Sequence, residues 1–204
     1  IIQYLDLTSL KSTDNVKTIT EFIKNSVFNC KSIDYYVGGI CCFSPFLSQI
    51  NAYKPSKEIK SVVVAAGFPH SQIPLSVKKE EIRYAIENNV DEVDICLNRG
   101  LFFEESREKA FQEISEIRNL LNLVNKKIVL KVILEVGELQ TYSNIMEASI
   151  LCLEIVLPVD DKSIIPISVV FISLISSSVF IPIVVCVVTG NTFIISYGFV
   201  FTFF

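Results

Sequence analysis

The sequence predicts an α/β fold built on a parallel sheet. Five short runs, four of which contain Val and Ile, alternate with longer segments in which apolar residues recur every three or four positions. Several of the short runs are apolar throughout, such as residues 62–66, and this is typical of parallel strands that helices cover on both faces. Because the connections are short, five β-then-α units in succession imply right-handed crossovers within one sheet.

Each predicted element follows from this alternation. The expected helices span residues 13–28, 45–53, 76–89, 105–124 and 141–154. Ser76 is expected to cap the third helix, with Glu80 and Glu81 in the early turns, where the helix dipole favours negative charge. The expected strands are Tyr4–Thr8, Val37–Phe43, Ile59–Gly67, Glu92–Asn98 and Lys127–Glu135.

The composition of the chain indicates a folded protein and excludes some classes of function. Of its 204 residues, 50% are apolar and 20% charged, which fits a globular domain. The net charge of −4 argues against nucleic acid as a partner, because phosphate binding needs clustered Lys and Arg. The six cysteines form no C-x-x-C pair and His70 is the only histidine, so we expect no metal site. With no signal peptide at its start, we expect a cytoplasmic chain with reduced thiols.

The end of the sequence differs sharply from the rest. Every charged residue lies at or before Lys162, and the stretch from Ser163 to Phe204 has no Asp, Glu, Lys, Arg or His. We therefore divide the chain into residues 1–154, with about five intact βα units, and an aberrant apolar tail at residues 155–204. Residues 164–188 are long enough to cross a bilayer, but Pro166 and Pro182 lie inside them. Out-of-frame or replaced sequence explains the lost charges better, and membrane association is the alternative if the tail is genuine.

Polar residues within the strands favour a barrel over an open sheet. No G-x-G-x-x-G follows the first strand, which weakens a dinucleotide-binding fold. Asp6, Thr8, Asp94 and Lys131 each interrupt an otherwise apolar strand, and a buried charge is unfavourable unless it is paired or functional. Any one of them could be a paired structural group. In a (β/α)8 barrel, however, inward residues from several strands converge on one pocket near the strands' C-terminal ends.

Four sequence blocks, in order and at matching spacing, resemble one enzyme family. The blocks are Leu5-Asp6-Leu7-Thr8-Ser9-Leu10, Gly67-Phe68-Pro69-His70, Asp91-Glu92-Val93-Asp94-Ile95 and Leu130-Lys131-Val132-Ile133-Leu134-Glu135 followed by Gly137-Glu138-Leu139. Together they resemble the deoxyribose-phosphate aldolases, which are (β/α)8 barrels, over about residues 4–154. One departure is Ser71, which stands where the family usually has Gly.

The resemblance implies a lyase of deoxynucleotide catabolism that needs no metal or cofactor. Such enzymes cleave 2-deoxy-D-ribose 5-phosphate to glyceraldehyde 3-phosphate and acetaldehyde through a Schiff base on a lysine. By the resemblance, Asp94 corresponds to the carboxylate of the proton relay. Asp6, Thr8 and Cys41 correspond to groups of the substrate pocket, and Lys131 to a pocket cation. His70 is expected to brace its turn rather than act as a base.

The resemblance stops where the Schiff-base lysine should lie. Carried over without gaps, the match places Asp161 at that position, with Lys162 adjacent and, in a strand, on the opposite face. The second lysine and the glycine-rich phosphate-binding turns of the family have no counterpart. We expect a chain of aldolase type, acting on a sugar phosphate and able to form a homodimer, that is inactive by itself. The alternative is a membrane-anchored or non-catalytic sugar-phosphate-binding half-barrel.

Overall fold

A computed structural model gives the fold of the chain, and it describes residues 2–30, 32–104, 107–124, 127–156, 167–172, 181–189 and 192–200. Its centre is a parallel sheet in the order β1-β4-β5-β6-β7. The strands span Asp6–Thr8 (β1), Gly39–Phe43 (β4), Lys60–Ala65 (β5), Glu92–Cys96 (β6) and Val129–Ile133 (β7). The five strands expected from the sequence are all present, with shorter bounds.

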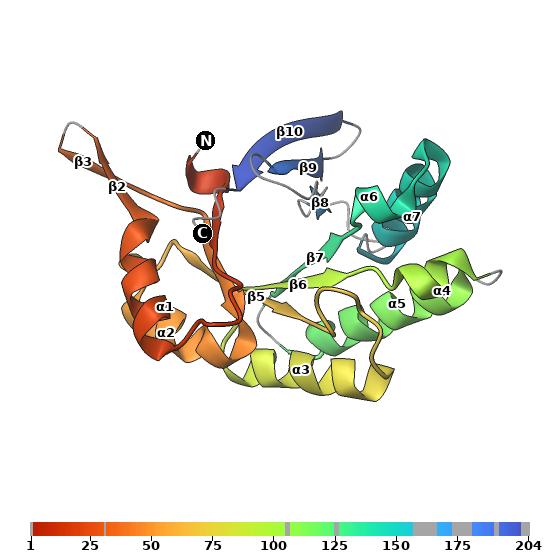
Figure 1. Ribbon diagram of the computed structural model, residues 1–204, viewed down its shortest axis with the longest axis horizontal. Helices are drawn as coiled ribbons and strands as arrows, with labels where there is room; N and C mark the ends of the chain where they lie inside the picture. Colours follow the sequence, from red (N-terminus) through yellow and green to blue (C-terminus); the bar gives the residue numbers. More distant parts are fainter. Residues whose placement is uncertain are drawn as a thin grey trace.

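Helices follow each strand and lie along the outer side of the curved sheet (Figure 1). The main helices are Val16–Ile23 (α1), Leu47–Tyr53 (α2), Leu75–Glu87 (α3), Glu108–Asn122 (α5) and Tyr142–Val156 (α7). Shorter elements join them: Ile2–Tyr4 (η1), Lys24–Ser26 (η2), Ser44–Phe46 (η3), Arg99–Phe103 (α4) and Val136–Leu139 (α6). We call the five parallel strands and these helices the half-barrel.

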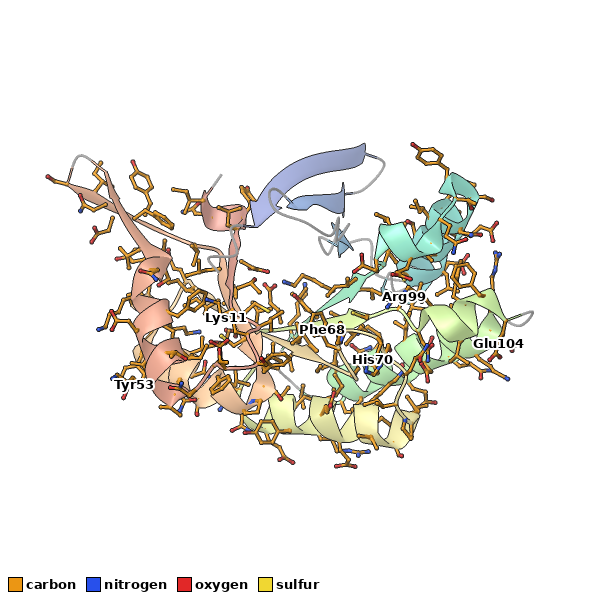
Figure 2. The ribbon with its side chains drawn as sticks, viewed as in Figure 1. Lys11, Tyr53, Phe68, His70, Arg99 and Glu104 are labelled. Atoms are coloured by element: carbon orange, nitrogen blue, oxygen red, sulfur yellow. The ribbon has the colours of Figure 1, made fainter. Side chains whose placement is uncertain are left out.

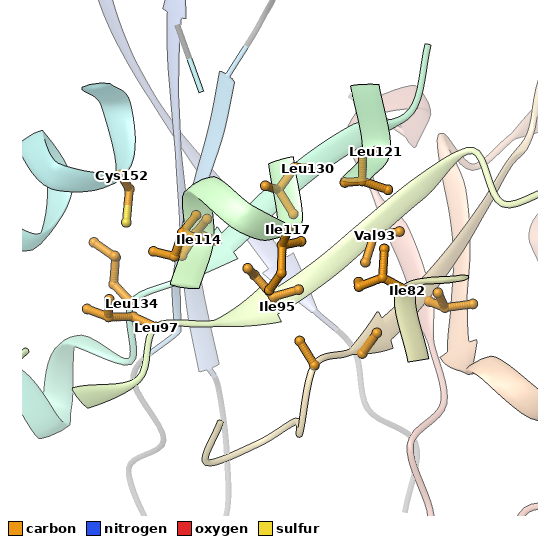
Figure 3. Packing of buried hydrophobic residues seen from close by; sticks show 14 of the residues in the cluster. Ile82, Val93, Ile95, Leu97, Ile114, Ile117, Leu121, Leu130, Leu134 and Cys152 are labelled. Atoms are coloured by element: carbon orange, nitrogen blue, oxygen red, sulfur yellow. The ribbon is translucent and has the colours of Figure 1, made fainter. Parts of the chain in front are cut away.

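The core of the half-barrel lies between the outer face of the sheet and the helices. Alternate strand residues point outward, and Val93, Ile95 and Leu130 are at most 1% exposed. Ile114 and Ile117, one turn apart on α5, pack against them (Figure 3). This layer fixes which strand residues point inward, because every second side chain must leave the core.

Two local expectations were wrong. The helix expected at residues 13–28 ends earlier, and a hairpin of Val27–Cys30 (β2) and Ile33–Tyr36 (β3) follows it. That hairpin projects away from the sheet in Figure 1. Ser76 does not cap α3, because the helix begins at Leu75 with Pro74 at the N-cap position, which places Ser76 inside the first turn.

The tail continues the sheet with a different pattern of strands. Ile167–Ile172 (β8) pairs with β7 in parallel, and Ile181–Thr189 (β9) and Thr192–Val200 (β10) add antiparallel strands beyond it. The parallel order therefore extends to β8, and antiparallel pairing begins with β9. Within the described residues, no helix combines the length and the apolar character needed to cross a membrane.

Candidate active site

The inner face of the half-barrel brings together the charged residues that interrupt its strands. Asp94 on β6 pairs in register with Lys131 on β7, so their side chains lie next to each other on the same face. Thr8 on β1 pairs in register with Cys41 on β4. Parallel pairing of the strands thus carries four of the predicted site residues to one interior surface.

Lys131 is enclosed by three carboxylates, and we call these four residues the Lys131 cage. Its Nζ lies 2.5 Å from Asp6 Oδ2, 3.1 Å from Glu92 Oε2 and 3.1 Å from Asp94 Oδ1. The Lys131 side chain is only 6% exposed, and that of Asp94 12%. Because little water reaches the group, the attraction between these charges is weakly screened.

Glu92 also belongs to the cage. The expectation from the sequence that its side chain lies on the outward-facing side of the strand was wrong. Glu92 lies two residues before Asp94 on β6, and residues two apart in a strand share a face. The same alternation that separates inward Asp94 from outward Val93 could have identified it. The family blocks drew attention to Asp94 alone, so this signal was missed.

Burial and charge together shift the pKa values in the cage. Burial alone would lower the pKa of Lys131, but the negative charges of Asp94, Asp6 and Glu92 outweigh it and hold that pKa well above its ordinary value. Burial raises the pKa of Asp94 to about 7, with Asp6 and Glu92 adding to the rise and Lys131 opposing it. Lys131 is therefore a fixed cation, whereas Asp94 can gain or lose a proton near neutral pH.

The other predicted pocket residues form the surroundings of the cage. Cys41 is buried, and burial followed by the charge of Asp94 raises the pKa of its thiol well above the usual range, so it is not a thiolate. Thr8 Oγ1 donates a hydrogen bond to the backbone oxygen of Asp6 at 3.1 Å, within its own strand. Gly39, on β4, leaves the space that the Asp6 side chain occupies.

The loops after β5 and β6 form the C-terminal rim above the cage. Phe68 and His70 lie on the loop after β5, and Arg99 begins α4, just after β6 (Figure 2). Ala66, Gly67 and Ser71 all have positive φ angles, a conformation that is rare outside glycine, so this turn is tightly constrained. The Nδ1 atom of His70 accepts a hydrogen bond from the backbone N–H of Gln72 at 3.0 Å, which agrees with the expected bracing role.

Two predicted residues cannot be placed relative to the cage. Asp161 and Lys162, at and beside the expected position of the Schiff-base lysine, lie outside the described residues. Among the residues that are described, no group of three or more His, Cys, Asp or Glu side chains is arranged to hold a metal ion. The carboxylates of the cage enclose an ammonium group instead.

Curated proteins with sequences similar to this chain are named deoxyribose-phosphate aldolase. The human deoxyribose-phosphate aldolase is 29% identical over 164 residues, which cover 74% of this chain and 50% of the relative. The deoxyribose-phosphate aldolase of Carboxydothermus hydrogenoformans is 32% identical over 136 residues, covering 66% of this chain and 56% of the relative. The chain thus spans about half the length of the curated relatives it matches, and no family model matches it.

Solved structures of aldolases share the fold. The aldolase QR15 superimposes with a TM-score of 0.62 at 25% identity, over 75% of this chain and 63% of its own. The deoxyribose-phosphate aldolase of Aeropyrum pernix, described as a unique tetramer, superimposes with a TM-score of 0.58 at 22% identity, over 74% of this chain and 60% of its own. These matches confirm the predicted barrel fold as a partial barrel.

Proposed function

Over about 74% of its length this chain belongs to the deoxyribose-phosphate aldolase family, and we propose that its inner face is the proton-transfer layer of such an aldolase. The substrate proposed is 2-deoxy-D-ribose 5-phosphate, cleaved in the parent reaction to glyceraldehyde 3-phosphate and acetaldehyde. The observation that carries this proposal is the Lys131 cage, in which Asp94 lies 3.1 Å from a buried ammonium group. Because the Asp94 carboxyl can gain or lose a proton near neutral pH beside the Lys131 cation, it can act both as a general acid and as a general base.

Lys131 itself does not serve as the nucleophile in this proposal. A Schiff base forms only from a free amine, and an active-site lysine reaches that state when burial or a neighbouring cation lowers its pKa. The three carboxylates around Lys131 have the opposite effect. We therefore assign Lys131 the role of a pocket cation that orients the substrate and balances the charge of the carboxylates.

The chain by itself is proposed to lack turnover. Where the family resemblance expects the nucleophile, the sequence reads Val159-Asp160-Asp161-Lys162, and no lysine follows Lys162. Without an imine there is no electron sink for cleavage of the carbon–carbon bond. Asp6, Asp94 and Lys131 would still allow a sugar phosphate to bind, which is the alternative, non-catalytic function.

Trapping with borohydride tests both parts of this proposal. The full chain is incubated with 2-deoxyribose 5-phosphate and sodium borohydride, and its intact mass is measured beside that of the human relative as a positive control. We expect a reduced adduct on the control and none on this chain. An adduct that disappears in Lys162→Met or Lys131→Met would show that the chain keeps a nucleophile and would overturn the inactivity. Ligand-observed NMR on the same samples reports binding, and binding without an adduct supports the non-catalytic function.

A further inference from the structure

Glu92 is a half-buried acid at the start of β6 for which the proposed reaction has no use. Its side chain is 19% exposed and its Oε2 lies 3.1 Å from Lys131 Nζ. Because β6 runs toward the C-terminal rim, Glu92 lies nearer the N-terminal end of the strands than Asp94, which follows it by two residues. A substrate that enters at the rim would meet Asp94 first.

The contacts of the ammonium group are unequal. Asp6 accepts a hydrogen bond from Lys131 Nζ at 2.5 Å. Glu92 Oε2 and Asp94 Oδ1 each lie 3.1 Å from the same nitrogen, and Lys131 lowers the pKa of Asp94 through its charge and through a hydrogen bond. The ammonium group is therefore held most closely by Asp6, and Glu92 and Asp94 share the rest of its surroundings at equal distance.

We propose that Glu92 is a positioning residue of this site, which anchors Lys131 from below so that Asp94 stays free to exchange a proton. Glu92 acts through Lys131 and Asp94 and does not touch the substrate. The use of this arrangement in catalysis rests on the proposed function, but the arrangement itself does not. Its effect on Asp94 can be measured without turnover.

The surroundings of Asp94 define what else could change its proton affinity. Lys131 faces it from β7, Asp6 from β1, Glu92 from its own strand and Cys41 from β4. On β5 the residue paired with Asp94 is Val64, which carries no charge. Removing the charge of Glu92 takes away one of the two carboxylates that raise the pKa of Asp94, and it frees Lys131 to turn toward Asp94.

The test is a carbon-13 NMR titration of aspartate carboxyl groups in the full chain, with the Asp94 signal identified by its loss in Asp94→Asn. In Glu92→Gln, which keeps the shape and removes the charge, we expect the pKa of Asp94 to fall by about 0.5–1 unit. Glu92→Asp keeps the charge and should hold the pKa near the wild-type value. Glu87→Gln, at the exposed end of α3, is the matched control and should change nothing.

Each outcome bears on the proposal. An unchanged Asp94 titration in Glu92→Gln would show that Glu92 only fills space and would overturn it. If Glu92→Gln does not fold, the test depends on Glu92→Asp. A pKa of Asp94 that is lower by about one unit or more in Glu92→Asp than in the wild type would then contradict the proposal. A failure of the aldolase function would leave the titration as predicted, so the two proposals fail separately.

Discussion

Lys131 Nζ contacts Asp6 Oδ2 at 2.5 Å, and this ion pair joins the first and the last of the five parallel strands. In a flat sheet these strands would be about 19 Å apart, since neighbouring strands are spaced about 4.8 Å. Two side chains of this length cannot bridge such a gap. The contact therefore requires a strongly curved sheet, and it links residues 125 positions apart in the sequence.

Loss of the cation should destabilise the chain. In Lys131→Met, the buried Asp94 and the half-buried Asp6 and Glu92 face one another without a counter-ion. Breaking a buried ion pair typically lowers the free energy of unfolding by about 3–5 kcal/mol. Urea unfolding measures this change. Lys24→Met is the control, because Lys24, just after α1, forms an exposed ion pair with Glu21 and its loss should change stability by under about 1 kcal/mol. Equal effects of the two substitutions would contradict a supporting role for the cage.

Asp94 should make stability depend on pH. Its pKa of about 7 in the folded chain lies above the value of about 4 expected when unfolded, so the folded chain binds the proton more tightly. Stability should therefore fall as pH rises, with most of the loss between about pH 4 and 7. Between pH 5 and 8 we expect a decrease of about 2–3 kcal/mol that is absent in Asp94→Asn. Urea midpoints at the two pH values test this, and parallel decreases in both proteins would refute it.

The fold was more predictable from the sequence than the site. In the continuous apolar strands and the amphipathic helices, the spacing of apolar residues indicates which faces are buried. The five βα units could therefore be predicted from that spacing. The hairpin of β2 and β3 was missed because its turn has none of the Asn-Gly or Asp-Gly pairs that mark a tight hairpin. Its first strand also follows α1 with only the short η2 between, so Val27 and Phe28 were assigned to the end of that helix, and the second strand was left unassigned.

The site was predicted in part, because a pattern of residues does not give distances. The sequence identified Asp6, Asp94 and Lys131 as polar interruptions of apolar strands. That all three meet depends on the curvature of the sheet, which no local pattern encodes. Glu92, at the edge of its strand, is not flanked by apolar residues on both sides, so it did not stand out as an interruption.

Gly39 should be essential for the position of Asp6. A Cβ atom at this residue would fall on Asp6 Oδ1 and 2.8 Å from Val62 Cγ2, so one of them must move. We expect Gly39→Ala to lower the free energy of unfolding by about 1–3 kcal/mol, as overpacking does. Combining it with Asp6→Ala should have less effect than the sum of the single changes, since the clash with Asp6 is then removed and only that with Val62 remains. Gly137→Ala, on exposed α6, is the control and should be neutral or slightly stabilising. Additive effects of Gly39→Ala and Asp6→Ala would argue against the clash.

Repair of the barrel tests the assignment of the catalytic roles. If residues 4–154 are the first half of an aldolase, joining the sixth to eighth strands of the human relative after Glu154 should restore cleavage of 2-deoxyribose 5-phosphate. Asp94→Asn in the repaired chain should then lose about 10²–10⁴-fold in kcat, the usual contribution of a positioned proton-transfer group. The control is Asp34→Asn, on the exposed β2–β3 hairpin. We expect that variant to keep its activity. If the repaired chain folds without activity, or if both substitutions reduce the rate alike, the likeness to the aldolases is one of fold alone.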